Sequence, residues 1–374
     1  MTSTDRERPV VLVAIDWYLP AYRAGGPIRS IANLVAALGE DIDFRIVCGH
    51  RDLGAKEDLP VQTGVWQDLG PARVQYLHPR DWTFAHWQRI LKEVEPDRLY
   101  LNSLYSGPFS RLPWKVARSL GVPTTLAPRG MLGKGALSIK PWRKKAWLRL
   151  QQLTGRYADI TWHASTEQER GEIQRWFPHA QIRVALNLPV PFDPLPLPED
   201  DGTLHLLSVG RVHPIKNYAL GVDLAKSLAA AGRNVHYRIV GPIEDRTVAQ
   251  ALQQSAEGFT LELLGPTPPT KVRQHFAEAH LILVPSFNEN YGHAVAEAVA
   301  CGRPVIVSDQ TVWSTMSHEA SVSCQPLRLE AWIEAAHGVL NMAPEDVMRL
   351  SEATYHQCLL DPQHLEAQRT LFLP

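Results

Sequence analysis

Short apolar runs alternate with amphipathic stretches along the first half of the chain. Segment 27–38 places its apolar residues on one face, which predicts a helix that packs against a sheet. Segment 166–177 predicts a second such helix, with Thr166 as its N-cap residue. This alternation predicts βαβ units around a mainly parallel sheet, an α/β fold. The predicted strands are 10–15, 44–49, 73–78, 98–102, 122–128, 159–165 and 182–187.

The pattern stops at 188–203, where LPVPFDPLPLPEDDGT contains five prolines, four acidic residues and no periodicity. Proline fixes φ and removes an amide donor, so this composition predicts an extended connector. Alternation then resumes, with predicted strands at 204–210, 235–241, 260–265, 281–287, 303–309 and 322–327. The predicted helices are 217–231, 246–256, 269–279, 292–301, 328–340 and 344–371.

These patterns divide the chain into a first domain over residues 1–190, a linker over 191–203 and a second domain over 204–355. A C-terminal helix over 356–374 can return to the first domain. A length of 374 residues fits two domains. Doubly wound sheets bind ligands at the carboxyl ends of their strands, so we expect a site where loops lead into helix N-termini.

Charge and cysteine content restrict the class of protein. The chain has 38 Lys and Arg against 39 Asp and Glu, and this balance argues against a nucleic-acid-binding protein. Four cysteines without a CxxC pair predict reduced thiols in a cytoplasmic protein. The apolar run near the N-terminus is too short for a signal peptide and predicts a core strand, and no window approaches the roughly 20 apolar residues that span a bilayer.

The stretch PSFNENYGHAVAEAVACGRPVIVSD, 285–309, predicts a strand end, a loop and a helix that begins near Gly292. The unpaired amides at the start of this helix suit a phosphate. Glu289 and Glu297 would be repelled by a diphosphate and instead suit the hydroxyl groups of a sugar and of a ribose on either side of it. That order of groups matches a nucleotide-sugar, although either glutamate taken alone fits a solvated surface charge.

A second candidate for anion binding is SVGRVHPIKNY, 208–218. A predicted strand ends at Gly210, and Arg211 and Lys216 follow in the loop before the next helix. Two cations at the carboxyl edge of a sheet can converge on one pyrophosphate. As isolated residues they would more often be solvated charges.

Three segments together resemble the C-terminal half of a family-4 retaining glycosyltransferase of GT-B fold: GRVHPIKN, LLGP at 263–266 and NENYGHAVAEAVACGRPVIVSD. The resemblance is specific over about 204–310, and looser in the first half through RAGGPIRS and WHASTEQER. It implies two Rossmann-like domains that face each other across a cleft. The first domain would bind the acceptor and the second the nucleotide-sugar.

The resemblance also implies roles for particular residues. Arg211 and Lys216 would bind the donor diphosphate and its leaving charge, Glu289 the donor sugar and Glu297 the ribose. The remaining donor contacts would be Asn290, Tyr291 and Gly292 through backbone amides, Gly265 near the nucleobase, and Gly25 and Gly26 near the diphosphate.

Many members of this family have a histidine near position 129, where this chain has Arg129 and Gly130. Arg129 and His163 are therefore candidates for contact with the acceptor or the donor sugar. For His163 the alternative is a structural role, which is common for a lone histidine after a strand.

Two further segments have alternative interpretations. Segment 140–156 is basic and contains two tryptophans, so it suits either an anionic membrane surface or a packed amphipathic helix. The motif Asp41-Ile42-Asp43 predicts a surface turn and not a metal site. No cofactor and no metal are expected, because Arg211 and Lys216 can neutralise the leaving diphosphate.

The sequence therefore predicts a cytoplasmic glycosyltransferase, with peripheral association at the inner face of the membrane as an option. It would move a hexose-type sugar from a nucleoside diphosphate to a saccharide or lipid-linked acceptor with retention of configuration. By family analogy the setting is bacterial surface polysaccharide or lipopolysaccharide assembly. The alternatives are a nucleotide-sugar epimerase or hydrolase of the same fold, or a catalytically silent donor-binding subunit.

Overall fold

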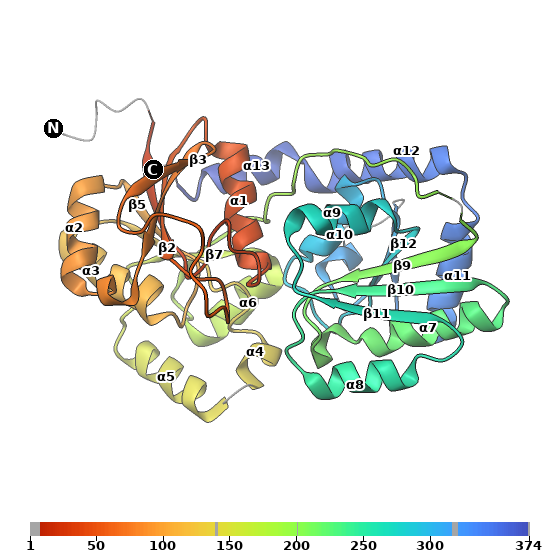
Figure 1. Ribbon diagram of the computed structural model, residues 1–374. Coiled ribbons are helices and arrows are strands. Elements are labelled where there is room, and N and C mark those ends of the chain that lie inside the picture. Colours follow the sequence, from red (N-terminus) through yellow and green to blue (C-terminus); the bar gives the residue numbers. More distant parts are fainter. Residues whose placement is uncertain (1–7, 139–140, 200, 316–320, 373–374) are drawn as a thin grey trace. The chain divides into compact units, whose positions relative to one another are not determined.

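The computed structural model describes residues 8–138, 141–199, 201–315 and 321–372 (Figure 1). It divides into two compact units, of which unit 1 is Met1–Leu188 with Pro362–Pro374 and unit 2 is Pro189–Asp361. The first boundary lies two residues before the predicted one at 190, and the segment that returns to the first domain begins at 362 instead of 356.

The proline-rich segment predicted as a linker over 191–203 belongs to unit 2. Its backbone amides at Asp193 and Leu195 donate to the carbonyls of Ala300 and Cys301, at 3.0 and 3.1 Å. Arg303 is fully buried and donates to the Leu195 carbonyl at 3.3 Å. The extended chain is held because its polar backbone groups find partners on the surface of unit 2.

Unit 1 contains an eight-stranded sheet with the order β3-β4-β2-β1-β5-β6-β7-β8. β3 pairs antiparallel with β4, and the other neighbours are parallel. β3 was not predicted, since it is a short and partly exposed edge strand. The strands are β1 Val10–Ala14, β2 Asp43–Gly49, β3 Trp66–Leu69, β4 Ala72–Leu77, β5 Arg98–Leu101, β6 Thr124–Leu126, β7 Thr161–Ala164 and β8 Gln181–Val184.

Helices cover both faces of this sheet, because alternate residues of a strand point to opposite faces. Val11 and Val13 of β1 belong to one apolar core, and Leu12 and Ala14 belong to another. The helical segments are α1 Gly26–Leu38, η2 Pro79–Asp81, α2 Phe84–Val94, η3 Gly107–Arg111, α3 Leu112–Leu120, α4 Lys134–Ser138, α5 Pro141–Leu153, α6 Glu167–Trp176 and α13 Pro362–Arg369. The predicted cap of α6 is confirmed, since the Thr166 hydroxyl accepts from the Glu169 amide at 3.1 Å.

Unit 2 contains a six-stranded parallel sheet with the order β11-β10-β9-β12-β13-β14. Numbered within the unit, this order is that of a dinucleotide-binding fold, and it reverses between β9 and β12. The strands are β9 Thr203–Val209, β10 Asn234–Val240, β11 Thr260–Gly265, β12 Leu281–Val284, β13 Val305–Ser308 and β14 Val322–Gln325. Each predicted strand of the chain is present, with ends that differ by a few residues.

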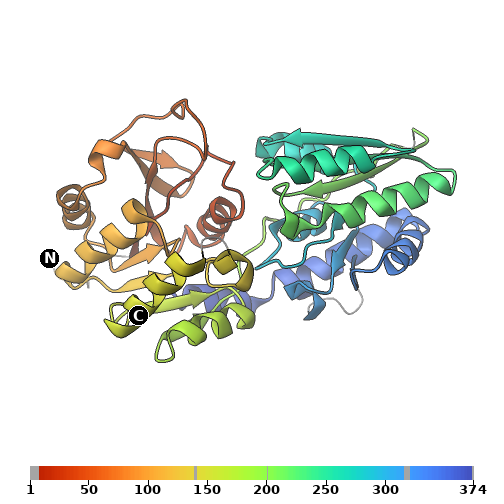
Figure 2. The same cartoon turned by 90° about the horizontal axis from the view of Figure 1, so that it is seen from below.

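Figure 1 shows α9 and α10 over one face of the unit 2 sheet and α7 and α8 over the other, and Figure 2 shows the layers of both units from below. The helical segments are η4 Pro214–Lys216, α7 Tyr218–Ala230, α8 Arg246–Ser255, α9 Pro269–Ala277, α10 His293–Ala300, η5 Val312–Thr315, α11 Leu329–Leu340, α12 Pro344–Thr354 and η6 Tyr355–Leu359. Helices α7 to α11 match the predicted ones, whereas the predicted segment 344–371 divides into α12, η6 and α13, and η4 and η5 were not predicted. The predicted α/β class is confirmed for both units.

Candidate active site

Three strands of unit 2 end in glycines that bring their backbones together. The Gly210 amide donates to the Val240 carbonyl at 2.8 Å, and the Gly241 amide donates to the Gly265 carbonyl at 2.9 Å. A Cβ atom on Gly241 would lie 2.1 Å from the Gly210 carbonyl oxygen, so only glycine fits there. The predicted nucleobase residue Gly265 lies in this group with φ of 68°. Gly241 was not singled out from the sequence.

Lys216 and Glu289 meet where the strand order of unit 2 reverses. Lys216 ends a short turn after β9, Glu289 follows β12, and the Lys216 Nζ lies 2.5 Å from the Glu289 Oε1. The Ser286 hydroxyl donates to the same carboxylate oxygen at 2.6 Å. The two charged side chains are only 16% and 13% exposed. The fold therefore joins two predicted donor residues that are 73 positions apart in sequence.

Arg211 has a different carboxylate partner. Its guanidinium donates to both oxygens of Glu244 at 3.0 and 2.8 Å, and about half of its side chain is exposed. The two cations predicted to converge on a pyrophosphate thus each hold a glutamate in this structure. Glu244 lies in the loop after β10, and no motif in the sequence pointed to it.

Tyr218 is a further residue of this site that the sequence analysis did not identify. It is buried, and its hydroxyl has no hydrogen-bond partner among the described residues. Burial raises the pKa of Tyr218 well above its usual value, with Tyr237 and Glu289 adding to the shift and Arg211 opposing it. A Cβ atom on Gly210 would lie 2.8 Å from the Tyr218 hydroxyl oxygen and 3.2 Å from the Lys216 Cε, so the hydroxyl lies on the same side of Gly210 as the Lys216 side chain. Its position directly after GRVHPIKN was the available signal.

The start of α10 is fixed by Gly292 and Trp313. Gly292 is the N-cap residue with φ of 81°, and a Cβ atom there would lie 2.9 Å from the Trp313 Nε1. The Trp313 Nε1 donates to the Tyr291 carbonyl at 2.8 Å. The Tyr291 side chain is buried, whereas its neighbour Asn290 is partly exposed. Tyr291 is thus suited to the predicted backbone contact and not to a contact through its hydroxyl.

Glu297 lies on α10, five residues after the N-cap Gly292. Burial raises the pKa of the Cys301 thiol to about 11, with Arg273 opposing and Glu297 adding to the shift. Burial also raises the pKa of Tyr291, and Tyr355 and Glu297 add to this effect. The negative charge of Glu297 therefore acts on both Tyr291 and Cys301.

In unit 1 the predicted Gly25–Gly26 loop is held by Asp52. Gly25 is the N-cap residue of α1 with φ of 66°, and no atom lies within 4 Å of a Cβ built on it. The buried Asp52 carboxylate accepts from the backbone amides of Tyr22 at 2.9 Å and Arg23 at 3.2 Å. Asp52 therefore positions the chain that leads into the glycines, a role that the sequence did not reveal.

Arg129 is the centre of a polar network at the carboxyl edge of unit 1. Its guanidinium donates to Asn102 Oδ1 at 2.6 Å, to Asn187 Oδ1 at 2.5 Å and to the Tyr100 hydroxyl at 2.9 Å. Arg129 has a positive φ of 53°, so its backbone is also constrained. Side chain and backbone are both held, which suits a residue that ties several strand ends together.

The structure corrects the suggestion that His163 contacts the sugar or acceptor. His163 is 1% exposed, its Nδ1 bonds the Tyr100 hydroxyl at 2.6 Å, and its Nε2 bonds the Ala185 carbonyl at 2.8 Å. Burial lowers the pKa of His163 to about 3, and the positive charge of Arg129 contributes to the same shift. The ring is neutral and fully used, so the structural alternative holds for this residue.

One group of metal-ligating side chains occurs among the described residues. His50, Asp58 and His78 bring one ligand atom each within 4.8 Å of one another. The His50 Nε2 lies 3.3 Å from the Asp58 Oδ1, which Arg51 also binds at 2.6 Å. These residues could hold a cation, but none of them is a predicted donor residue, and metal-free chemistry stays a prediction.

The two aspartates of the DxD motif each pair with an arginine. Asp41 pairs with Arg369 and Asp43 with Arg45.

Helix α5 covers most of the basic segment 140–156, of which Lys140 lies outside the described residues. Leu148 and Gln151 are buried on its inner face, and Trp147 packs against Tyr105 and Tyr157 at ring distances of 5.3 and 6.2 Å. The outer face exposes cations and apolar side chains together: Trp142, Arg143, Lys145, Arg149, Leu150 and Leu153. Within the described residues no helix has the length and apolar character needed to cross a membrane.

Two doubly wound α/β units in one chain are the architecture of the GT-B class of glycosyltransferase folds. The family model described as glycosyl transferases group 1 matches residues 192–357, and that of the glycosyl transferase 4-like domain matches residues 25–187. The chain belongs to the group 1, family-4 glycosyltransferases.

Curated relatives match only parts of this chain. A D-inositol 3-phosphate glycosyltransferase of Geodermatophilus obscurus is 33% identical over 113 residues, 28% of this chain and 25% of the relative. An O-antigen chain mannosyltransferase B of Escherichia coli is 25% identical over 131 residues, 34% of each chain. These matches thus span about a quarter to a third of the relatives' lengths.

A solved structure matches nearly the whole chain. The Anabaena protein HepE, in complex with UDP and glucose, has a TM-score of 0.70 at 13% identity and covers 97% of this chain and 99% of its own. At this identity the likeness concerns the fold alone.

Proposed function

We propose that this protein transfers a hexose-type sugar from a nucleoside diphosphate to a saccharide or lipid-linked acceptor, with retention of the anomeric configuration. The observation that carries the proposal is the ion pair between Lys216 and Glu289 at the reversal of the unit 2 strand order. It places a cation for phosphate and an acceptor for sugar hydroxyls side by side. The similarity to a named glycosyltransferase, and the likeness in fold to a protein solved with UDP and glucose, support this interpretation.

In this proposal the donor diphosphate replaces the present partners of the two cations. Lys216 would leave Glu289 for a phosphate oxygen, and Arg211 would do the same with respect to Glu244. The backbone amides at the start of α10, after Gly292, would add donors to the phosphate. Glu289, released from Lys216, would accept hydrogen bonds from sugar hydroxyls, and Glu297 would accept those of the ribose.

The chemistry then requires positioning and charge stabilisation. The bond between the anomeric carbon and the diphosphate oxygen breaks, and the acceptor oxygen bonds to the same face of the sugar. The leaving phosphate takes the proton of the acceptor hydroxyl. Arg211 and Lys216 stabilise the charge that develops on the diphosphate, a contribution that typically amounts to about 2.7–4 kcal/mol per donor group. No metal takes part in this proposal.

We place the activity in surface polysaccharide or lipopolysaccharide assembly, at the inner face of the cytoplasmic membrane. The similarity to an O-antigen chain mannosyltransferase supports the setting. The outer face of α5 supports the membrane contact, because exposed cations and exposed Trp142 and Leu153 occur together there. Such a face suits anionic headgroups with shallow insertion of the apolar side chains.

The test is a panel of nucleotide sugars offered to the purified protein, followed by calorimetry and by slow donor hydrolysis. Lys216→Ala and Glu297→Ala should weaken the binding of one donor, whereas Lys226→Ala and Glu330→Ala, elsewhere on unit 2, serve as matched controls. Product from that donor with a saccharide or lipid-linked acceptor, of retained configuration by NMR, would support the proposal. Donor conversion without acceptor use would favour an epimerase or hydrolase, and binding without turnover a silent subunit.

A further inference from the structure

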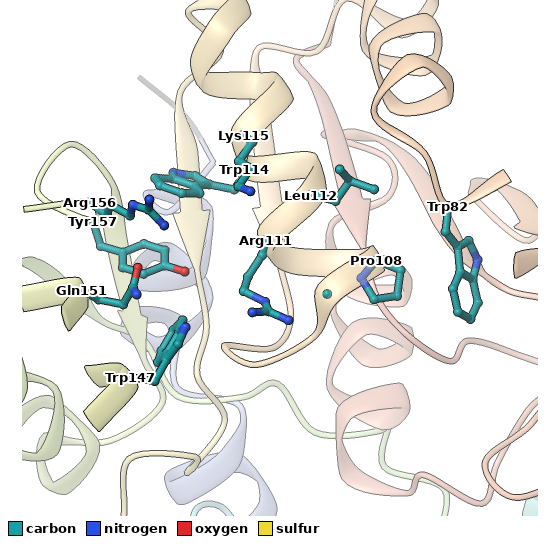
Figure 3. A pocket seen from close by; sticks show the side chains of 11 residues that line it. Trp82, Pro108, Arg111, Leu112, Trp114, Lys115, Trp147, Gln151, Arg156 and Tyr157 are labelled. Atoms are coloured by element: carbon teal, nitrogen blue, oxygen red, sulfur yellow. The ribbon is translucent and has the colours of Figure 1, made fainter. Parts of the chain in front are cut away.

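Unit 1 contains a pocket of about 440 Å³ between η3, α3 and the end of α5 (Figure 3). Of the segments predicted from the sequence to bind a partner, 140–156 contributes Trp147, Gln151 and Arg156 to this pocket. Its walls are aromatic: the rings of Trp114 and Tyr157 stack at 4.8 Å, and Trp147 lies 6.2 Å from Tyr157. Trp114 and Tyr157 are buried in the unit 1 core, so this wall is rigid. A pocket of this size is within the range of sites for small molecules.

The charged side chains that line the pocket are all cationic. Arg111, Lys115 and Arg156 line it, and its lining contains no carboxylate. Among the described residues, none of these three cations forms an ion pair, whereas the nearby Arg118 pairs with Asp159 at 3.2 Å. Burial raises the pKa of Tyr157 to about 12, and the charges of Arg111 and Arg156 oppose that shift. The positive charges of Arg111 and Arg156 thus both act on the Tyr157 hydroxyl group.

The pocket also contains a polar group without a partner. Gln151 of α5 is 3% exposed, and no described residue hydrogen-bonds its side-chain amide. Figure 3 shows this amide beside Tyr157 and Trp147, with the Arg111 guanidinium opposite. The amide opens into the pocket, where it can donate to and accept from the polar atoms of a ligand. The pocket therefore has cations at its rim, an amide inside and aromatic walls. These features suit an anion attached to a sugar or to an apolar group.

We propose that this pocket binds the phosphate or diphosphate group of an amphipathic acceptor, a specificity that rests on the proposed transferase function. Three cations without carboxylate partners match a group with two or more negative charges, and Arg111 and Arg156 can each bind phosphate oxygens in a bidentate manner. The rings of Trp147 and Tyr157 then contact the sugar or apolar part beside the phosphate.

The surroundings of the pocket fit a lipid-linked form of this acceptor. Trp147 and Gln151, which line it, belong to α5, and the same helix exposes Leu150 at 54% and Leu153 at 85%. An acyl or prenyl chain attached to the phosphate can follow these exposed side chains. On its other side the pocket is lined by Gly107 and Arg111 of η3, which follows β5 at the carboxyl edge of the sheet.

The test measures binding of farnesyl diphosphate, inorganic pyrophosphate and farnesol to the full chain by calorimetry. The affinity for farnesyl diphosphate should fall by about 10-fold to 100-fold in each of the variants Arg111→Gln, Lys115→Gln and Arg156→Gln. This is the range for one lost hydrogen bond to a charged group. Lys92→Gln and Arg175→Gln, exposed cations of unit 1 outside the pocket and outside α5, are the matched controls and should change nothing. All five replaced side chains are exposed, so the variants are expected to fold, which circular dichroism checks.

The comparison of ligands separates the sources of the anion. If pyrophosphate binds as tightly as farnesyl diphosphate and depends on the same three cations, the site recognises phosphate alone and the lipid adds nothing. Farnesol binding as tightly as the diphosphate would overturn the proposal, as would farnesyl diphosphate binding that ignores the three substitutions.

The donor site is measured in the same variants. Lys216→Ala should lower the affinity for the donor and leave the affinity for farnesyl diphosphate unchanged. The three pocket variants should lower the affinity for farnesyl diphosphate and leave that for the donor unchanged. If no nucleotide-sugar binds to any variant, the transferase function fails, while the pocket is still judged by its own titration.

Discussion

Replacement of Lys216 by methionine and of Glu289 by glutamine, singly and together, tests the ion pair at the centre of the candidate site. Exposed pairs contribute about 0.2–1 kcal/mol, and breaking a buried pair costs about 3–5 kcal/mol. With exposures of 16% and 13%, this pair lies between those cases. We therefore expect a coupling free energy of about 1–2 kcal/mol in a double-mutant cycle.

Thermal unfolding measures this coupling. Each single variant should melt roughly 2–8 °C lower, since 1 kcal/mol shifts a domain of this size by about 2–4 °C. The double variant should melt close to the single ones, because the second substitution removes an interaction that is already lost. Losses that simply add would refute the interpretation that the two side chains form one stabilising pair.

The same variants test catalysis. Lys216→Met should lower kcat/KM by roughly 100-fold to 1,000-fold, which is the usual effect of removing a group that stabilises leaving charge. The assay follows product formation with the donor that the binding panel identifies. An unchanged kcat/KM, together with a lowered melting temperature, would limit Lys216 to a structural role.

Asp52→Ala removes the acceptor for two backbone amides before Gly25, so stability should fall by about 1–3 kcal/mol and donor affinity should weaken, whereas the exposed Glu57→Ala should change neither. His163 stays neutral when folded because its pKa is lowered to about 3, so its contribution to stability is present above pH 6.5 and is lost as the pH falls towards 3. Denaturation from pH 7 to 4 should show a smaller loss in His163→Gln than in the wild type, and equal losses would contradict this. Treatment with EDTA should leave transfer unchanged; a loss restored by added metal would direct attention to His50, Asp58 and His78.

The periodic part of the fold could be predicted from the sequence. Buried parallel strands such as Leu281–Val284 are continuous apolar runs, and α1 and α6 have one apolar face each, so their patterns are clear. The edge strand Trp66–Leu69 is polar and partly exposed, and it pairs with β4 through backbone hydrogen bonds that leave no apolar pattern. The proline-rich segment has a linker composition, yet Arg303 buries part of it against unit 2 through contacts that only the fold creates.

The residues of the candidate site likewise include some that the sequence reveals and some that only the fold brings together. Lys216 and Glu289 belong to motifs and could be identified, but that they bind each other depends on β9 and β12 being neighbours. Glu244 and Asp52 act through distances and burial that no local pattern encodes, whereas the position of Tyr218 directly after GRVHPIKN was an available signal. His163 shows the opposite error, in which a motif suggests a functional role. The structure shows this histidine to be a buried structural residue.

The return of the chain to unit 1 has a consequence for the order of events during synthesis. Phe372 is buried against Phe44 and Tyr100, at ring distances of 5.9 and 5.2 Å. The ribosome makes Phe44 early and Phe372 only after all of unit 2. Until then the part of the unit 1 core that Phe372 covers is exposed to solvent. Unit 2 is continuous in sequence and can fold before the chain is complete. A premature stop codon late in the gene would therefore harm the domain made first, and a chaperone that shields the patch until α13 arrives would aid the yield of native protein.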